Sequence, residues 1–308
     1  MSRWSFVVCC VVLACASSAE AKKYKVYYLG GQSNMDGYGY NAELPKGLDD
    51  KLAGVMIFHG NTAEDGQPVD GRGHWAKLQP GHGVGFSSDG QANKYSDRFG
   101  VELSFAAKLR ELEPDAPIAI IKYSRGGTSI DAAAAGGFGC WEPDFAGGSG
   151  TGQGINQYDH FLATIRGATA SADIDGDGEA DELVPAGILW MQGESDAAHT
   201  PEIAQRYEAN LKRLADLIRA ALRTDDLPIV IGRISDSGKD PDGKVWDHGP
   251  TVQAAQAAFV EKDGHAALVT STDKYGYSDP WHYDTAGYLD LGERFAEAVH
   301  GLQPKSAL

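Results

Sequence analysis

The sequence predicts a single doubly wound α/β domain, in which helices cover both faces of a parallel sheet. Short apolar segments typical of strands alternate along the chain with longer segments of helical periodicity. The strands are apolar throughout, as in strands that are buried on both faces. No internal repeat or low-complexity linker divides the segment from residue 24 to residue 302, and single α/β domains of this length are common.

The first half of the domain contains three predicted elements. Residues 24–29 (YKVYYL) are rich in strand-forming residues. Residues 101–112 place apolar side chains at helical spacing. Residues 117–123 (PIAIIKY) form the continuous apolar run that is typical of a buried strand. Two long glycine-rich loops, at about 59–96 and 134–157, are expected to interrupt the pattern.

The second half continues the alternation of strands and helices. From Pro201 to Leu222, apolar residues recur every three or four positions, which predicts an amphipathic helix with proline at its start. Residues 251–263 suit another helix, and Thr285 is the expected cap of the last one. Apolar strands are expected at 186–191, 228–234 and 267–271.

Residues 1–21 have the features of a secretory signal peptide. The positive residue is Arg3, the apolar region runs from Ser5 to Ala14, and the A-x-A cleavage site is Ala19-Glu20-Ala21. We expect cleavage after Ala21 and a secreted or periplasmic protein. A buried N-terminal strand and a lipoprotein signal ending at Cys15 are the alternatives. No later stretch approaches the roughly 18 apolar residues of a membrane span, so no membrane insertion is expected.

The composition argues against several classes of partner and site. Of the 308 residues, 43 are acidic and 27 are Lys or Arg, which gives a net charge of −16. A field of that sign repels phosphate groups, so nucleic acid and anionic membrane surfaces are poor partners. Cys140 is the single cysteine beyond the predicted signal peptide, which excludes an internal disulfide and a cysteine metal cluster there.

Polar segments follow several of the predicted strands. Ligands of doubly wound sheets bind beyond the carboxyl ends of the strands, so these segments are candidates for the functional site. We expect all four to meet at one edge of the sheet. They are 30–35 (GGQSNM), 124–128 (SRGGT), 192–196 (QGESD) and, near the chain end, 279–282 (DPWH).

Ser33, His282 and Asp279 have the residue types of a nucleophilic serine site. A serine hydroxyl reacts only when a base, usually an oriented histidine, removes its proton. His282 is the candidate base, and Asp279, three residues earlier in a turn begun by Pro280, can orient it. Taken alone, Ser33 suits a helix N-cap and His282 a surface position; the joint placement favours catalysis.

Acyl transfer also needs hydrogen-bond donors directed at the developing oxyanion. The candidates are the backbone N–H of Ser33, a backbone N–H of Gly126 or Gly127, and the side-chain amide of Gln192. Glycine suits this place because the main chain can approach the substrate closely. A plain turn at the two glycines and a strand-end hydrogen bond at Gln192 are the alternatives.

Four segments together resemble the conserved blocks of the SGNH-hydrolase superfamily. They are GQSNM at 31–35, GGTSI at 126–130, WMQGESDA at 190–197 and DPWH at 279–282. They are most similar to the branch of sialate O-acetylesterases and acetylxylan esterases, carbohydrate esterase family six. The resemblance implies a flavodoxin-like three-layer αβα sandwich and hydrolysis of acetyl esters on sugars. It also implies that Ser33 is the nucleophile, His282 the base and Asp279 its orienting partner, with Gly126 or Gly127 and Gln192 at the oxyanion positions.

Other residues of these blocks have expected supporting roles. Asn34, Glu194 and Asp196 are expected to support the site, the last two by holding the loop or the Gln192 amide; a capped helix start is the alternative for those two. Arg125 can anchor a substrate carboxylate, or form a surface salt bridge. Trp281 stands between the candidate catalytic residues and is expected to contact a sugar face.

Residues 173–181 (DIDGDGEAD) form a separate acidic loop. Its spacing matches positions 1, 3, 5, 7 and 9 of a Ca²⁺ loop, but Val184 stands where an EF-hand needs a bidentate Glu. We expect structural Ca²⁺ here, with a solvated acidic loop as the alternative; the serine route itself requires no cofactor. The expected ligands are Asp173, Asp175, Asp177, the Glu179 carbonyl and Asp181.

The sequence thus predicts a secreted serine esterase that removes acetyl groups from a glycan. Two alternatives remain. A non-catalytic, Ca²⁺-braced carbohydrate-binding protein would bind glycans without ester turnover. A lipid or thioester hydrolase on the same fold would prefer long acyl chains, although the sequence has polar, glycine-rich loops and no extended apolar lid segment.

Overall fold

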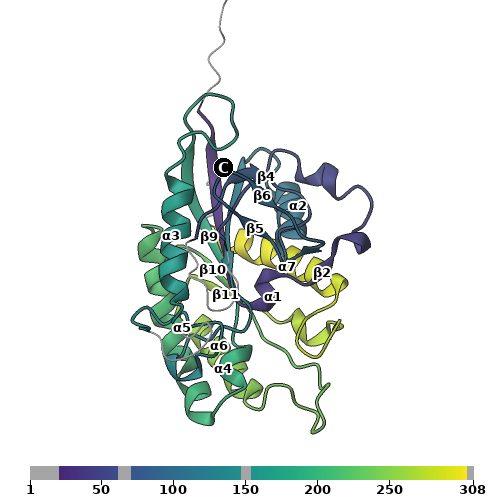
Figure 1. The fold of residues 1–308 in the computed structure, drawn as a ribbon, viewed down its shortest axis with the longest axis vertical. Coiled ribbons are helices and arrows are strands. Elements are labelled where there is room, and N and C mark those ends of the chain that lie inside the picture. Colours follow the sequence, from purple (N-terminus) through teal and green to yellow (C-terminus); the bar gives the residue numbers. More distant parts are fainter. Residues whose placement is uncertain (1–20, 62–70, 147–153, 304–308) are drawn as a thin grey trace, which may run out of the picture.

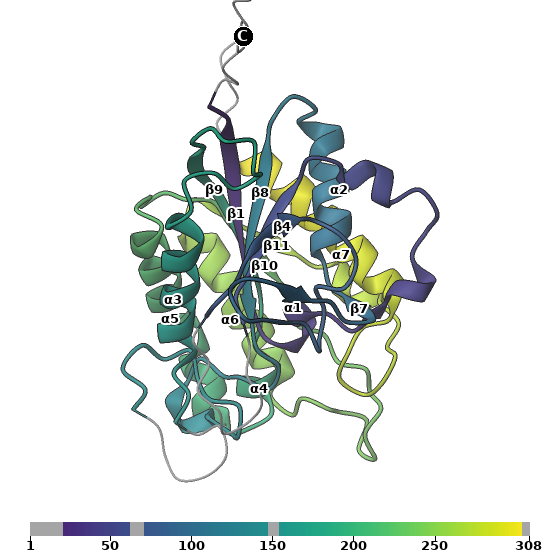
Figure 2. The ribbon, with the colours of Figure 1, turned by 45° about the horizontal axis from the view of Figure 1, so that its top comes forward.

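The computed structural model describes residues 21–61, 71–146 and 154–303. They form three layers, with a central sheet between two groups of helices (Figure 1). The turned view shows the same arrangement, with α3 and α5 on one side of the sheet and α2 and α7 on the other (Figure 2). The predicted three-layer α/β fold is therefore confirmed. The predicted signal peptide lies, except for Ala21, outside the described residues.

The main sheet has seven strands in the order β11-β10-β9-β1-β8-β3-β4. All neighbouring pairs are parallel except β3 and β4, which are antiparallel. The expectation of a parallel sheet therefore fails only at this edge strand. The strands are β1 (Lys23–Gly31), β3 (Met56–His59), β4 (Trp75–Lys77), β8 (Ile118–Ser124), β9 (Glu182–Met191), β10 (Ile229–Gly232) and β11 (Ala266–Val269). Two small ribbons pair β2 (Gly39–Tyr40) with β7 (Arg98–Phe99), and β5 (Ser87–Ser88) with β6 (Asn93–Lys94).

Two helical layers cover the sheet. α7 packs against α2 and the strands β10 and β11, and α6 packs against α5. Within the described ranges, no helix has both the length and the apolar character needed to cross a bilayer. The helices are α1 (Ser33–Asp36), α2 (Glu102–Leu112), α3 (Gln157–Thr169), α4 (Glu194–Ala197), α5 (Pro201–Ala221), α6 (Gly249–Lys262) and α7 (Thr285–Leu302); short 3-10 turns are η1 (Asn41–Glu43), η2 (Asp49–Leu52), η3 (Ala132–Ala134) and η4 (Ser271–Lys274).

Most predicted elements appear within a few residues of their expected bounds. The cap of α7 is a correction: the Asp284 side chain accepts the N–H of Gly287, and Thr285 is the first helical residue. The carboxylate is the stronger acceptor at a helix N-terminus, where the helix dipole favours negative charge. The sequence did not predict β3, β4 or α3. Residue Asn156, placed at the end of the second glycine-rich loop, caps α3 through its side chain.

A buried lysine is the exception in an apolar strand. All seven residues of β8 are buried, and Lys122 among them is fully shielded from solvent. Its ammonium donates to the carboxylate of Glu102 at 2.8 Å and to the carbonyl oxygens of Asp36 and His82. A buried charge is tolerated only with such partners. Lys122 thereby joins the last residue of α1 to the strand beneath it.

Three central strands end at the same level of the sheet. In the strand register, Gly31 at the end of β1 lies opposite Ser124 of β8 and Met191 of β9. Gly31 has φ +143°, and a side chain there would lie 2.0 Å from the Met191 carbonyl oxygen. Only glycine fits this approach. The segments that follow these strands consequently start beside one another, as the sequence predicts.

Candidate active site

His282 and Asp279 form a hydrogen-bonded pair in the turn before α7. Asp279 Oδ2 lies 2.7 Å from His282 Nδ1, and Asp279 Oδ1 accepts the backbone N–H groups of Trp281 and His282 at 2.8 Å each. Burial lowers the pKa of His282 below its ordinary value, although the hydrogen bond and charge of Asp279 oppose this. The imidazole is therefore mainly neutral at pH 7, with Nδ1 protonated toward the carboxylate and Nε2 available as a base.

The carboxyl of Asp279 stays ionised beside the imidazole. Its burial acts to raise the pKa, but the hydrogen bonds from His282 and from the Trp281 N–H outweigh burial and hold the pKa below its ordinary value. The carboxylate can therefore stabilise an imidazolium formed at His282.

Ser33 is the first residue of α1 and follows β1 with one residue between them. Gln32 N donates to the Met191 carbonyl, which anchors the turn to the neighbouring strand. Ser33 is buried, with 6% of its surface exposed. Among the described residues, nothing accepts the backbone N–H of Ser33. This N–H is therefore free to face a substrate oxygen.

Asn34 connects the turn of Ser33 to the turn of His282. Its Nδ2 donates to the Trp281 carbonyl oxygen at 3.2 Å, and its Oδ1 accepts the Tyr283 N–H at 3.4 Å. Ser33 precedes Asn34 in the sequence, and His282 lies between Trp281 and Tyr283. The bridge therefore joins the two turns next to both candidate catalytic residues. In the described part of the chain no hydrogen bond joins Ser33 Oγ to His282, and such catalytic bonds are often long without substrate.

Gly126 lies beside Ser33, whereas a side chain at Gly127 would point at Phe138. A side-chain carbon on Gly126 would lie 3.2 Å from Ser33 Cβ. Gly127 has φ +71°, and a carbon placed on it would lie 2.4 Å from the ring of Phe138. Gly127 needs to be glycine because of its positive φ, whereas a side chain at Gly126 would press on Ser33. The sequence left open which of the two faces the oxyanion, and this placement favours Gly126.

The Gln192 amide is occupied by other acceptors. Its Nε2 donates to Asp196 Oδ2 at 2.6 Å and to the Thr128 carbonyl at 3.1 Å, and its Oε1 accepts the Tyr207 hydroxyl. An amide has two N–H donors, so neither remains free for an oxyanion in this conformation. The bond to Asp196 is the support that the sequence predicts for the Gln192 amide, and donation from Gln192 to an oxyanion stays a prediction.

Asp196 and Gln32 hold the loops around Gln192. The Asp196 carboxylate also accepts the N–H groups of Ile130 and Asp131, and burial raises its pKa to about 6. Gln32 Oε1 accepts the backbone N–H groups of Gly193 and Ser195. Asp196 therefore joins the segment after β9 to the segment after β8, as expected for a supporting residue; the role of Gln32 was not predicted.

Glu194 is buried beside Asn34. Its Oε1 accepts Asn34 Nδ2 at 2.7 Å, while its Oε2 has no hydrogen-bond partner among the described residues. Burial raises the pKa of Glu194 to about 7. Asn34 and Glu194 thus lie where the sequence placed supporting residues.

Tyr38 is a site residue that lies outside the four sequence blocks predicted to form the site. Its ring is stacked on the imidazole of His282, with ring centroids 3.5 Å apart and planes at 5°. The contact joins segments that are far apart in the chain. Nothing in the residue spacing predicts it.

Trp281 and Arg125 lie near the same edge. Trp281 is 50% exposed, which leaves its ring accessible beside His282. The Arg125 guanidinium carbon lies 5.3 Å from the centroid of the Phe138 ring, and its charge acts on the buried carboxyl of Asp36. Both residues therefore remain candidates for substrate contact.

The acidic loop has a partner of its own. Carboxylate oxygens of Asp173, Asp175 and Asp177 lie within 4.8 Å of one another. Lys22 Nζ pairs with Asp175 and, at 2.6 Å, with Asp177. Part of the charge compensation that we expected from a cation thus comes from this ammonium. Asp181 Oδ2 accepts the Ile174 N–H, and Glu179 and Asp181 lie outside the group of three.

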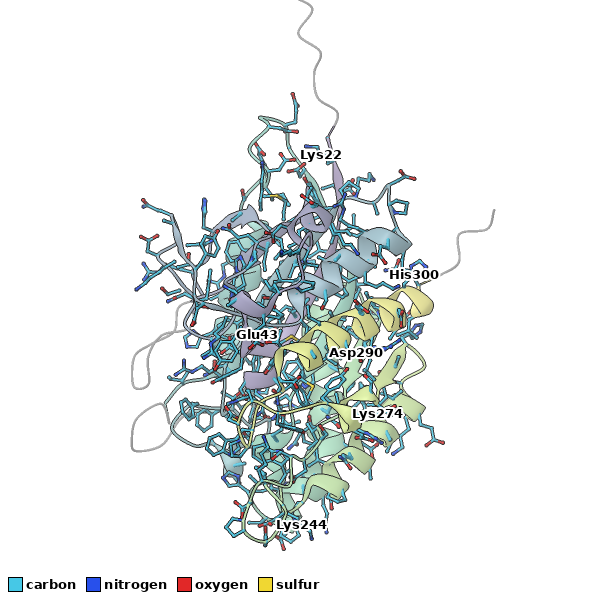
Figure 3. All side chains as sticks on the ribbon, turned by 90° about the vertical axis from the view of Figure 1, so that its right-hand side faces the viewer. Lys22, Glu43, Lys244, Lys274, Asp290 and His300 are labelled. Carbon is cyan, nitrogen blue, oxygen red and sulfur yellow. The ribbon has the colours of Figure 1, made fainter. Side chains whose placement is uncertain are left out.

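The acidic loop is remote from the candidate active site. Figure 3 shows Lys22 at one end of the molecule and Lys244, from the loop after β10, at the other. The carboxyl ends of the parallel strands point toward the Lys244 end of the molecule. An ion held by the loop would therefore act on stability and not on the reacting groups.

Comparison with known proteins assigns the family. A family model described as "Carbohydrate esterase, sialic acid-specific acetylesterase" matches residues 23–301. No curated protein matches the chain. Similar solved structures include a protein of Arabidopsis thaliana, with 20% identity and a TM-score of 0.56 over 92% of this chain and 99% of that chain.

Two further structures have related folds. A carbohydrate acetylesterase from Xanthomonas citri, XAC1771, has 19% identity and a TM-score of 0.57 over 90% of this chain and 56% of that chain. NanS has 16% identity and a TM-score of 0.53 over 92% of this chain and 98% of that chain. At these identities the likeness shows the fold, while the family model covers nearly the whole described chain. The chain therefore belongs to the sialic acid-specific acetylesterase family of carbohydrate esterases and is a carboxylic ester hydrolase.

Proposed function

We propose that Ser33, His282 and Asp279 form the catalytic triad of this esterase and that its substrates are O-acetyl esters on glycans. The observation that carries the proposal is the Asn34 bridge. The Asn34 amide hydrogen-bonds to the backbone of Trp281 and of Tyr283, which flank His282. Asn34 itself directly follows Ser33 in the sequence. Nucleophile and base therefore belong to turns that are held together by one buried side chain.

In the proposed reaction, His282 Nε2 removes the proton of Ser33 Oγ as this oxygen attacks the acetyl carbonyl carbon. The carbonyl oxygen becomes an oxyanion that accepts hydrogen bonds from the N–H groups of Ser33 and Gly126. The imidazolium then donates its proton to the leaving sugar oxygen as the bond between this oxygen and the acetyl carbon breaks, which leaves Ser33 acetylated. A water molecule, deprotonated by His282, attacks the acetyl carbon. The imidazolium returns the proton to Ser33 Oγ as acetate leaves.

The surroundings of the triad support a sugar ester as substrate. Trp281 offers a half-exposed aromatic face beside His282, and such faces suit the C–H faces of sugars. Arg125 is a candidate contact for the carboxylate of an acidic sugar such as a sialic or uronic acid. Both sialate O-acetylesterase and acetylxylan esterase activities fit this site.

Substitution of Ser33 by Ala tests the triad. With p-nitrophenyl acetate as substrate, we expect kcat to fall by at least about 10³-fold, as for the loss of a nucleophile in other serine hydrolases. The melting temperature of the variant, measured by circular dichroism, is the control for folding. Unchanged turnover would exclude Ser33 as the nucleophile.

A substrate panel distinguishes the proposed function from its alternatives. Acetate release from acetylated xylan or acetylated sialic acid supports a carbohydrate acetylesterase. Preferred cleavage of long-chain esters would indicate a lipid hydrolase on the same fold. Glycan binding without turnover would indicate a carbohydrate-binding protein.

The pH profile tests His282 as the base. Because burial lowers its pKa below the ordinary value of 6.5, the imidazole stays neutral into mildly acidic solution. We expect the fall of kcat/KM on the acidic side to lie below the ordinary imidazole pKa of 6.5. A profile that stays flat to pH 4 would contradict this role.

We also propose that the protein is exported and cleaved after Ala21. The support is the order of Arg3, the apolar region and the A-x-A site in the sequence. N-terminal sequencing of the exported protein should begin at Lys22. A mature chain that still contains Arg3 would contradict cleavage.

A further inference from the structure

We propose that Tyr38 is a positioning residue for His282, and that its ring fixes the plane of the imidazole. This inference rests on the proposed function, in which His282 is the base. The two rings are nearly parallel, at 5°, with centroids 3.5 Å apart. Tyr38 thus covers one whole face of the imidazole.

The hydrogen bond to Asp279 does not by itself fix the imidazole. It holds Nδ1 at 2.7 Å from the carboxylate, but a single in-plane contact leaves the ring free to tilt about that contact. A flat surface pressed against one face prevents the tilt. Nε2, on the far side of the ring, is then directed along one line, which proton transfer from Ser33 requires.

Tyr38 can serve as a fixed surface because its backbone is held on both sides. Its carbonyl oxygen accepts Arg98 Nη1 at 2.9 Å. The preceding Gly37 carbonyl accepts the Val84 N–H, and the N–H of Tyr40, two residues after Tyr38, donates to Thr285 Oγ1 at 3.1 Å. These contacts tie Tyr38 to β7 and to the first turn of α7, close to the turn that carries His282.

The ring also removes water from one face of the base. Burial is the largest cause that lowers the pKa of His282, and the charge of Arg98 acts in the same direction. Asp279 opposes both, and Trp281 faces the imidazole edge-on at 6.3 Å. If Tyr38 is removed, water reaches the imidazole, burial weakens and the pKa of His282 rises.

The proposal assigns the effect to the ring and not to the hydroxyl. The hydroxyl oxygen lies 3.9 Å from the point that a side-chain carbon on Gly126 would occupy, so it is near the nucleophile. Phenylalanine keeps the stacked ring and removes this oxygen. Leucine removes the ring and keeps an apolar side chain. The two variants therefore separate the two contributions.

The experiment measures kcat, KM and the pH dependence of kcat/KM for p-nitrophenyl acetate in the full chain. For Tyr38→Phe we expect wild-type kcat and an unchanged acid limb, which is the fall of kcat/KM at low pH. For Tyr38→Leu we expect kcat to fall about 10- to 100-fold with little change in KM, and the acid limb to move to higher pH. Tyr95→Leu removes an exposed aromatic ring that packs on His82 and Phe86, and it is the matched control with wild-type kinetics.

Three results would overturn the proposal. Tyr38→Leu with the wild-type acid limb would show that the ring does not act on the base. Equal losses in Tyr38→Phe and Tyr38→Leu would assign the effect to the hydroxyl. An unchanged kcat in Tyr38→Leu would remove the positioning role. If the leucine variant melts below the assay temperature, Tyr38→Met, with an unbranched side chain, replaces it.

Failure of this inference differs from failure of the proposed function. If Ser33→Ala is inactive while Tyr38→Leu matches the wild type, the triad stands and only the role of Tyr38 is wrong. If Ser33→Ala is fully active, the triad itself is wrong.

Discussion

Glu194 is a buried carboxyl whose ionisation should destabilise the folded protein. Only 1% of its surface is exposed, and its pKa is raised from 4.5 to about 7 by burial. Because the folded state binds the proton more tightly than the unfolded state, stability falls as pH rises from the unfolded pKa through the folded one. Between pH 5 and pH 8 these two pKa values correspond to a loss of roughly 2–3 kcal/mol from this one group.

The substitution Glu194→Gln removes this titration. The glutamine Oε1 can still accept Asn34 Nδ2, which is 2.7 Å from Glu194 Oε1, so the bridge between the Ser33 and His282 turns is kept. We therefore expect the variant to retain esterase activity. Its free energy of unfolding relative to the wild type should increase by roughly 2–3 kcal/mol from pH 5 to pH 8.

Urea unfolding at pH 5, 6, 7 and 8, followed by circular dichroism, measures this difference. The comparison with the wild type cancels the buried carboxyls of Asp36 and Asp196, whose pKa values are also raised, to about 6 each. Glu261→Gln, at an exposed position of α6, controls for the loss of one negative charge. A difference between Glu194→Gln and wild type that does not change with pH would refute the reasoning.

Three further predictions concern the triad, the oxyanion site and the acidic loop. Asp279→Asn should reduce kcat about 10³- to 10⁴-fold at neutral pH by favouring the wrong tautomer of His282; a loss below tenfold would contradict the orienting role. Gly126→Ala places a carbon 3.2 Å from Ser33 Cβ, so a folded variant should show lower kcat with p-nitrophenyl acetate. A wild-type kcat would show that the contact between residue 126 and Ser33 does not matter for the reaction. Ca²⁺ at 100 times its Kd should stabilise the protein by about 2.7 kcal/mol, seen as a higher Tm than in chelator, while initial rates stay equal; no change in Tm, or the same rise in Asp177→Asn, would contradict a calcium site.

The pattern of apolar residues was sufficient to predict elements whose burial is the same along their whole length. The helix from Pro201 has an apolar stripe that is buried in the hydrophobic core, and all residues of β8 are buried. Because burial is what the pattern encodes, these elements are found close to their expected bounds. β3 has only four residues, too few for a recognisable pattern. α3 is longer, but it begins at the end of a glycine-rich loop, and that loop was expected to reach residue 157.

Contacts along the chain could be predicted, but contacts across it could not. The pair Asp279 and His282 is three residues apart, and the expected hydrogen bond is present. Gln192 shows the opposite case. It was expected at an oxyanion position, but its Nε2 also donates to the Thr128 carbonyl oxygen, 64 residues away in the chain. This contact forms only once β8 and β9 lie on either side of β1.

The sequence alone determined the alternation of elements, the order of four polar blocks and the residue types that ester hydrolysis needs. These follow from local propensity, periodicity and residue chemistry, which depend only on residues that are close together in the sequence. Only the tertiary structure decided that Gly126 rather than Gly127 lies against Ser33, that Asn34 bridges the two turns, and that Tyr38 covers His282. These contacts depend on how strands pair and where loops return, and a linear pattern does not contain those distances.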